Sequence, residues 1–266
     1  MQYGYFQSDT YDTPERERLT IGDRLKLNSR LYFLYKYATI VFRTRKQARS
    51  GIYDDKAWAD SSNYIFRFIE NTGARFHIKG MENIISSPEP VVFIGNHMST
   101  LETMILPGLI APLRRVTFVV KESLVNHPLF GDVMSSRDPI IVGRTDPRKD
   151  LEAVMNGGAE LLSAGISVVI FPQSTRSVEF IPEEFNSLGV KLAKKAGVKV
   201  VPVALKTDYW GNGKLVKELG PIDRHKPVFI KFGQPFDIKG TGREENQKII
   251  DFIQLSLSEW KDIREK

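Results

Sequence analysis

Apolar residues recur along the chain with two spacings, one typical of helices and the other of buried strands. Short continuous apolar runs predict strands that are covered on both faces. Longer segments, with apolar residues three or four positions apart, predict helices between them. Strands are expected at 75–79, 91–95, 116–120, 139–142, 166–171, 198–205 and 228–232, and helices at 99–109, 150–164, 183–196 and 244–260. This alternation predicts an α/β fold with a central mixed sheet flanked by helices.

The N-terminal region has a different pattern. Residues 1–18 are polar and predict a disordered tail, and a second helix is expected at 54–70, after a first helix at 20–42. In that first helix, apolar residues follow at four- and three-residue spacing: Leu27, Leu31, Leu34, Ala38 and Val41. We therefore divide the chain into a tail (1–18), an N-terminal amphipathic two-helix element (19–72), which the resemblance described below implies to be a membrane-docking element, and an α/β domain (73–266). An ordinary helix packed on the core explains the same spacing.

The positive charge is concentrated in one segment. The 266 residues carry a formal net charge of +6. Eight basic residues and one acidic residue give +7 between Thr20 and Ser50, so the rest of the chain sums to −1. No recognition motif for nucleic acid accompanies this segment, so an anionic membrane surface is the better partner. No signal-peptide pattern and no run of about 18 apolar residues is present. We expect a peripheral or monotopic protein on the cytoplasmic face of a membrane.

Several kinds of site are excluded by composition and motif. The chain has no cysteine, which excludes disulfides, thiolate metal sites and cysteine nucleophiles. Phosphate-loop, dinucleotide-binding, serine-elbow and zinc-protease motifs are absent. With four histidines in all, a histidine-rich metal site is not expected either. We expect neither a metal nor a bound cofactor.

One histidine directly follows a predicted buried strand. His97 comes two residues after Gly95, and ligand sites in open α/β sheets gather at the carboxyl ends of strands. Glu102 is five residues further on, and on one continuous helix the two side chains would point about 140° apart. They meet only if His97 lies in the loop and Glu102 in the first helical turn, with Ser99 as N-cap. A carboxylate bound to one imidazole nitrogen leaves the other as a general base.

A structural role for Glu102 explains the same residues. Ser99-Thr100-Leu101-Glu102 is also a capping box, in which Glu102 satisfies the backbone at Ser99. This stretch by itself leaves both interpretations open.

Two further strand ends carry phosphate-binding side chains. The strand at 166–171 leads into a polar turn with Thr175, Arg176 and Ser177, and the strand at 139–142 leads into Arg144. Hydroxyls donate hydrogen bonds, and a guanidinium holds phosphate in a bidentate way. A lone arginine after a strand is usually a solvated surface residue, so it is the combination of strand ends that indicates a site.

These blocks together resemble the glycerolipid acyltransferases, the family that includes lysophosphatidate acyltransferase. His97 and Glu102 resemble the family's His-x4-Asp motif, and Arg144 its second block. Residues 171–177 are similar to Phe-Pro-Glu-Gly-Thr-Arg-Ser, and residues 200–205 to the fourth block. Lys121 and the turn at 128–131 fit the pattern between the first two blocks. The resemblance covers about residues 75–236, and the N-terminal helices resemble the family's two-helix docking element.

The resemblance implies a mechanism and roles for residues. A fatty acyl group would pass from acyl-CoA or acyl carrier protein, as co-substrate, to the free hydroxyl of a lysophospholipid. The acceptor implied is 1-acylglycerol-3-phosphate, which would give phosphatidate. His97 would be the general base, with Glu102 orienting it. The substrate-binding residues would be Lys121, Arg144, Gln173, Ser174, Thr175 and Arg176.

Three departures from the family pattern affect the choice of acceptor. Glu102 replaces aspartate, Gln173 replaces glutamate, and Ser174 replaces glycine. If that glycine position requires a positive φ, serine costs about 1–2 kcal/mol there. Three alternatives therefore stay open: a different lysolipid or amino-acid-lipid acceptor, a catalytically silent membrane-binding module, and a thioester hydrolase.

Overall fold

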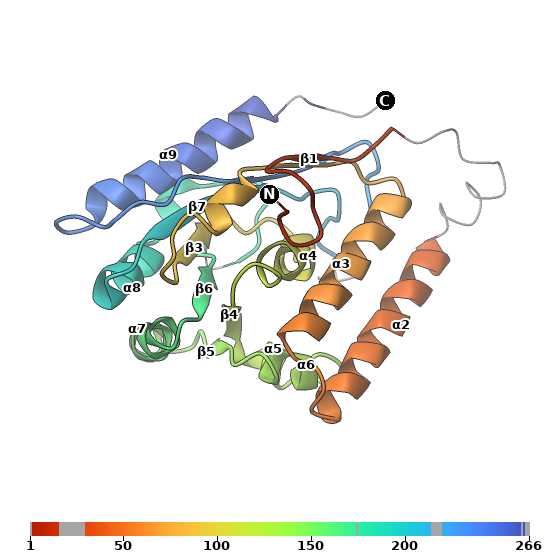
Figure 1. Ribbon diagram of the computed structural model, residues 1–266, viewed down its shortest axis with the longest axis horizontal. Coiled ribbons are helices and arrows are strands. Elements are labelled where there is room, and N and C mark those ends of the chain that lie inside the picture. Colours follow the sequence, from red (N-terminus) through yellow and green to blue (C-terminus); the bar gives the residue numbers. More distant parts are fainter. Residues whose placement is uncertain (1, 16–29, 174, 214–219, 262, 264–266) are drawn as a thin grey trace.

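The central sheet of the computed structural model is mixed, as the sequence predicts (Figure 1). The structure describes residues 2–15, 30–173, 175–213, 220–261 and 263. In these residues eight strands form one sheet in the order β1-β2-β8-β7-β3-β6-β4-β5. The strands are β1 (Tyr11–Asp12), β2 (Phe76–Lys79), β3 (Val92–Gly95), β4 (Val116–Lys121), β5 (Ile140–Val142), β6 (Ser167–Ile170), β7 (Val200–Lys206) and β8 (Val228–Phe232). Strands β7, β3, β6, β4 and β5 are parallel, whereas β8 runs antiparallel to β7 and β1 to β2.

Helices cover both faces of this sheet. The described helices are α2 (Arg30–Arg49), α3 (Asp55–Asn71), α4 (Thr100–Ile110), α5 (Glu122–Val125), α6 (Gly131–Ser135), α7 (Pro147–Ser163), α8 (Leu188–Ala196) and α9 (Arg243–Glu259). In Figure 1, α2, α3 and α4 lie on one side of the strands, and α7, α8 and α9 on the other. Two hydrophobic clusters, one on each face, match this arrangement.

Strand β3 is apolar throughout because both of its faces are covered. Phe93 belongs to the cluster under α3 and α4, whereas Val92 and Ile94 belong to the cluster under α7, α8 and α9. All three side chains are fully buried. On the α8 side the approach is close: a Cβ on Gly189 would lie 2.7 Å from Cδ1 of Ile94. The burial of β3 fixes the position at which the chain leaves the sheet toward His97.

The N-terminal tail differs from the prediction. Residues 2–15 are not a disordered tail, because Tyr3 and Phe6 are buried and β1 pairs antiparallel with β2. The reason is aromatic packing, which the mostly polar composition of this segment does not indicate. The Phe6 ring lies 5.4 Å from the Phe66 ring, edge to face. In addition, the Tyr11 hydroxyl donates to the Glu70 carboxylate at 2.5 Å. Residues 16–18 lie outside the described residues.

Helix α2 has one core-facing side and one exposed side. It ends at Arg49, seven residues beyond the predicted end at 42. Its Tyr37, Ile40 and Val41 side chains are buried, whereas Tyr35 and Phe42 are 66% and 58% exposed. The core-helix interpretation therefore holds for one face. Much of the predicted apolar stripe lies outside the described side chains, at Leu27, Leu31 and Leu34. Among the described residues, no helix is long and apolar enough to cross a membrane.

Helix α8 begins later than predicted. The expected helix at 183–196 is divided into a 3₁₀ turn (Pro182–Glu184) and α8, which starts at Leu188. Between them, the Asn186 side chain accepts from the backbone N–H of Leu188 at 2.9 Å and donates to the carbonyl of Pro172. These local hydrogen bonds compete with the helical ones and delay the helix start.

Candidate active site

The predicted chemical residues lie at one edge of the sheet. His97 follows β3, the segment from Gln173 to Arg176 follows β6, Lys121 ends β4, and Arg144 follows β5. These four strands are parallel neighbours, so their carboxyl ends meet at the same edge. This is the edge at which open α/β sheets bind ligands.

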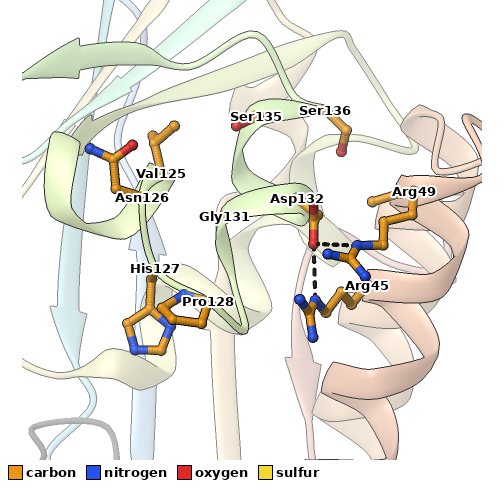
Figure 2. A pocket seen from close by; sticks show the side chains of 11 residues that line it. Arg45, Arg49, Val125, Asn126, His127, Pro128, Gly131, Asp132, Ser135 and Ser136 are labelled. Atoms are coloured by element: carbon orange, nitrogen blue, oxygen red, sulfur yellow. Dashed lines mark hydrogen bonds and ion pairs between the residues drawn. The ribbon is translucent and has the colours of Figure 1, made fainter.

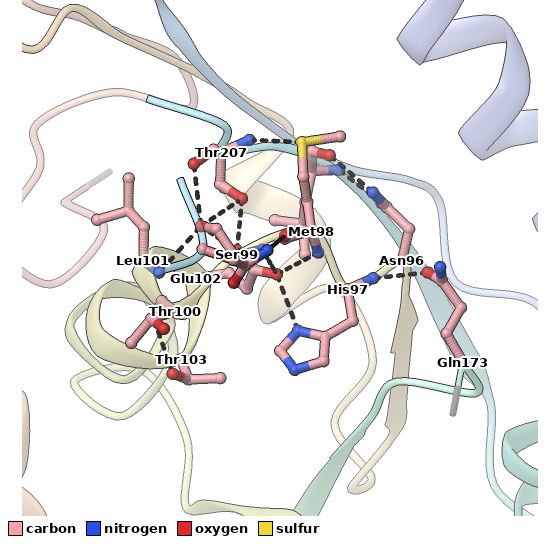
Figure 3. A network of polar contacts seen from close by, with 12 residues as sticks. Asn96, His97, Met98, Ser99, Thr100, Leu101, Glu102, Thr103, Gln173 and Thr207 are labelled. Carbon is pink, nitrogen blue, oxygen red and sulfur yellow. Dashed lines mark hydrogen bonds and ion pairs between the residues drawn. The ribbon is translucent and has the colours of Figure 1, made fainter. Parts of the chain in front are cut away.

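His97 and Glu102 make the contact that the sequence permits. Nδ1 of His97 lies 2.9 Å from Oε1 of Glu102, with His97 in the loop before α4 and Glu102 in its first turn (Figure 3). The capping box is present as well, since the backbone N–H of Ser99 donates to the Glu102 carboxylate at 2.9 and 3.1 Å. The structure therefore contains both contacts that the sequence allows for Glu102. One carboxylate starts the helix and also binds the imidazole.

The Glu102 carboxylate is fully buried and surrounded by donors. Besides His97 and Ser99, it accepts from the backbone N–H of Met98 at 2.6 Å and from the hydroxyl of Thr207. Burial alone raises the pKa of Glu102. The hydrogen bond and positive charge of His97, with the bonds from Thr207 and Ser99, outweigh burial and hold that pKa below its ordinary value. The carboxylate is therefore ionised at neutral pH.

His97 is held on both its backbone and its ring. Its backbone N–H donates to Oε1 of Gln173 at 2.7 Å, and its carbonyl accepts from the backbone N–H of Ser177 at 2.9 Å. The Phe171 ring stacks on the imidazole with centroids 4.5 Å apart and planes 8° apart. No described residue hydrogen-bonds to Nε2, which points away from the Glu102 network in Figure 3. The arrangement fixes the ring and leaves Nε2 for a reactant.

Gln173, predicted to bind substrate, contacts the loop that carries His97. It is 3% exposed, and its side-chain oxygen is occupied by the backbone of His97. Thr175, in the same turn, is exposed, and Arg176 is half-buried with interactions of its own. Ser174 lies outside the described residues. This turn is next to His97 because β6 is the immediate neighbour of β3.

Lys121 and Arg144 lie further along the same edge. Both are exposed. Strand β5 is the third strand from β3, so Arg144 starts about 14 Å away from His97 at roughly 4.8 Å per strand. Arg144 has φ = 60°, and its backbone N–H donates to Asp150 at 2.9 Å. The structure thus brings His97, Glu102 and Gln173 together and leaves the two outer cations at the rim.

Thr207 is the residue that sequence reasoning missed. It directly follows β7, is fully buried, and its backbone N–H lies 3.3 Å from the sulfur of Met98. Next to it, the Asn96 side chain exchanges two hydrogen bonds with the backbone of Leu205, at 2.7 and 2.9 Å. The strand-end rule that found His97 applies equally to Thr207, which follows the fourth block by two residues.

A separate hollow of about 530 Å³ lies between α2 and the α5–α6 turn (Figure 2). Asp132 of α6 accepts from Nε of Arg45 at 2.9 Å and from Nε of Arg49 at 3.0 Å. The hydrogen bond from Arg45 holds the pKa of Asp132 below its usual value. None of the residues that line the hollow belongs to the His97 network described above. The ion pairs of Asp132 with Arg45 and Arg49 anchor α2 to α6.

Comparison with known proteins identifies the family of this chain. The model of the Acyltransferase family matches residues 75–206, a range that includes His97, Glu102 and Gln173. A 1-acyl-sn-glycerol-3-phosphate acyltransferase from Pseudomonas aeruginosa is 30% identical over 215 residues, which cover 79% of this chain and 78% of that protein. The chain belongs to the acyltransferase family. This confirms the family that the motifs predicted, and with it the prediction of an acyltransferase.

A second curated relative and one solved structure also match this chain. A chloroplastic 1-acyl-sn-glycerol-3-phosphate acyltransferase from Arabidopsis thaliana is 33% identical over 161 residues, 60% of this chain and 41% of that protein. The crystal structure of the 1-acyl-sn-glycerophosphate acyltransferase PlsC from Thermotoga maritima matches with a TM-score of 0.63 and 22% identity. It covers 91% of this chain and 98% of that one. That likeness supports the fold.

Proposed function

We propose that this acyltransferase moves a fatty acyl group from an acyl thioester to the free hydroxyl of 1-acylglycerol-3-phosphate, giving phosphatidate. The observation that carries the proposal is the imidazole of His97, bound through Nδ1 at 2.9 Å to a buried carboxylate, with Nε2 available. A general base in this arrangement suits hydroxyl activation. The names of the relatives from Pseudomonas and Arabidopsis support this acceptor.

The proposed reaction needs one base and no covalent enzyme intermediate. Nε2 of His97 takes the proton of the acceptor hydroxyl as its oxygen attacks the thioester carbonyl. Glu102 stabilises the imidazolium that forms, because its carboxylate is already ionised and aligned on Nδ1. The carbon–sulfur bond then breaks, and the leaving thiolate takes the proton from His97. The products are the ester and the free thiol of the donor.

The acceptor phosphate is proposed to bind along the sheet edge beyond His97. Thr175 and Arg176 are nearest, since their turn follows the strand next to β3. Lys121 and Arg144 contribute positive charge from β4 and β5, where both side chains are exposed. Ser174 completes the proposed set from the same turn. The donor is acyl-CoA or acyl carrier protein.

The site is proposed to work at an anionic membrane surface, with the protein peripheral or monotopic on the cytoplasmic face. Exposed Tyr35 and Phe42 lie on the same helix as exposed Arg43 and Lys46. Each cation near such a surface contributes about 1 kcal/mol. Because α2 buries Tyr37 in the core, removal of residues 1–50 would damage the fold. Charge reversal at Arg43 and Lys46 is the cleaner test, and salt-sensitive vesicle binding should fall.

A turnover assay tests the chemistry. The purified protein is given acyl-CoA or acyl carrier protein and a panel of lysophospholipid and amino-acid-lipid acceptors, in parallel with His97→Ala. We expect phosphatidate from the wild type and a loss of about 10²–10⁴-fold in rate for the variant. Equal rates from both proteins would disprove the mechanism. Preference for another acceptor would disprove the assigned substrate, and donor hydrolysis without transfer would indicate a thioesterase.

A further inference from the structure

Oε2 of Glu102, the carboxylate oxygen that does not face His97, is held by a residue from another part of the sheet. Oε1 accepts from His97, Met98 and Ser99. Oε2 accepts from the hydroxyl of Thr207 and, at 3.1 Å, from the backbone N–H of Ser99. Thr207 is 105 residues from Glu102 in the sequence and follows β7, the neighbour of β3. Figure 3 shows it above the carboxylate, on the side away from the imidazole.

Two hydroxyl groups compete around Oε2, and each has one proton to donate. The Ser99 hydroxyl lies 2.9 Å from the carbonyl of Thr207 and 3.1 Å from Oε2. The Thr207 hydroxyl has the shorter contact with Oε2, and Ser99 is its other neighbour at 3.0 Å. The best assignment therefore sends the Ser99 proton to the Thr207 carbonyl and the Thr207 proton to Oε2.

We propose that Thr207 is a positioning residue for the His97–Glu102 pair, one that fixes Oε2 so that Oε1 stays aligned with Nδ1 of His97. The proposal rests on the acyl transfer proposed above. Thr207 is fully buried behind the carboxylate, so it acts through Glu102 and does not touch substrate. A hydroxyl donated to an anion also lowers the proton affinity of that anion.

Within the described part of the chain, His97 is the titratable side chain that contacts the Glu102 carboxylate. The other groups that contact the carboxylate, from Met98, Ser99 and Thr207, are neutral. Asp208, the next residue, is turned to Lys206 at 3.2 Å and Lys226 at 2.8 Å. A change at Thr207 should therefore affect the His97–Glu102 pair through hydrogen bonding to Glu102.

The test replaces Thr207 by valine, which keeps the shape and removes the hydroxyl. We expect kcat to fall about tenfold, the value of one charge-assisted hydrogen bond, with both KM values unchanged. The proton affinity of the pair rises, so the acid limb of the kcat profile should move to higher pH by about one unit. Thr207→Ser, which restores the hydroxyl, should restore both. Thr207→Ala removes the same group with less steric demand.

Thr117→Val is the matched control. Thr117 is a buried threonine of β4 whose hydroxyl donates to the backbone carbonyl of Arg137 at 2.7 Å, and it is not part of the His97 network. Its replacement should lower thermal stability without moving the pH profile. Wild-type kcat and profile in Thr207→Val would overturn the proposal. So would equal losses in the serine and valine variants, or loss of folding in both Thr207→Val and Thr207→Ala. Failure of the wild type to transfer acyl groups would instead count against the proposed function.

Discussion

Replacement of Glu102 by glutamine separates the two tasks of this residue, helix capping and support of the imidazole. Oε1 accepts from His97, Met98 and Ser99, so the amide oxygen of glutamine should occupy that place. The amide nitrogen then takes the place of Oε2, where the Thr207 hydroxyl can turn and accept. The shape and most hydrogen bonds are kept. What is lost is the negative charge beside the imidazole.

The size of the effect follows from the geometry. With charge centres about 4 Å apart and an effective dielectric constant near 20, the charge stabilises the imidazolium by up to about 4 kcal/mol. Charge-assisted hydrogen bonds contribute about 1.5–3 kcal/mol. We therefore expect kcat to fall about 10²–10³-fold. The contact from the backbone N–H of Ser99 to Oε2, at 3.1 Å, is lost, so the free energy of unfolding should fall by about 1–2 kcal/mol.

Glu70→Gln is the control for removing a buried carboxylate. Glu70 is 5% exposed and accepts from Tyr11 at 2.5 Å, Thr13 at 2.7 Å and Arg67 at 3.0 Å, in a network that does not include His97. It should lose stability and keep kcat. Steady-state kinetics and thermal unfolding of both variants decide the matter. If Glu102→Gln keeps kcat within threefold of wild type while its stability falls, Glu102 acts as a helix cap alone and the proposed mechanism is wrong.

Three further predictions concern the same edge of the sheet. Gln173→Ala should lower kcat because the backbone N–H of His97 loses its acceptor at 2.7 Å. Gln173→Glu keeps an acceptor and should stay active. Equal kinetics for Gln173→Ala and wild type would contradict this prediction. Arg176→Ala should raise KM for phosphorylated acceptors more than Arg144→Gly does, because the turn with Arg176 follows the strand next to β3. Glycine is chosen at position 144 because it suits the positive φ of Arg144. KM values in the reverse order would refute the proposed phosphate site. The pKa of Glu102 in the folded protein lies below its ordinary value of 4.5, so ionisation of Glu102 stabilises the fold above about pH 4.5, and this stabilisation is lost as pH falls through the folded pKa. The difference in thermal stability between wild type and Glu102→Gln should therefore shrink below about pH 4.5. A difference that stays constant with pH would contradict this prediction.

The sequence by itself determined most strands of the central sheet and the positions of His97 and Glu102 relative to α4. Continuous apolar runs predicted β3 and β6, because a strand covered on both faces has no polar side. The spacing of His97 and Glu102 permitted a single geometry, one residue in the loop and the other in the first turn, and that geometry is present. Local rules sufficed here because capping and strand ends depend on neighbouring residues.

Other features depended on long-range packing. The tail at 2–15 reads as polar, but Tyr3 and Phe6 find a hydrophobic surface that α3 and β2 create only after folding. The orientation of helix α2 also depends on tertiary packing, since an apolar stripe has the same sequence pattern whether it faces a membrane or the protein core. Only the tertiary structure places Tyr37 inside and Phe42 outside.

The support of the active-site pair was decided entirely by the tertiary structure. Thr207 reaches Glu102 over 105 residues of sequence, and Gln173 reaches the backbone of His97 over 76, each from the end of another strand. A threonine or glutamine at a strand end has no local pattern that names its partner, because a single hydrogen bond leaves no periodicity in the chain. The order of the strands places β6 and β7 on either side of β3, and the segments that follow these three strands therefore form one site.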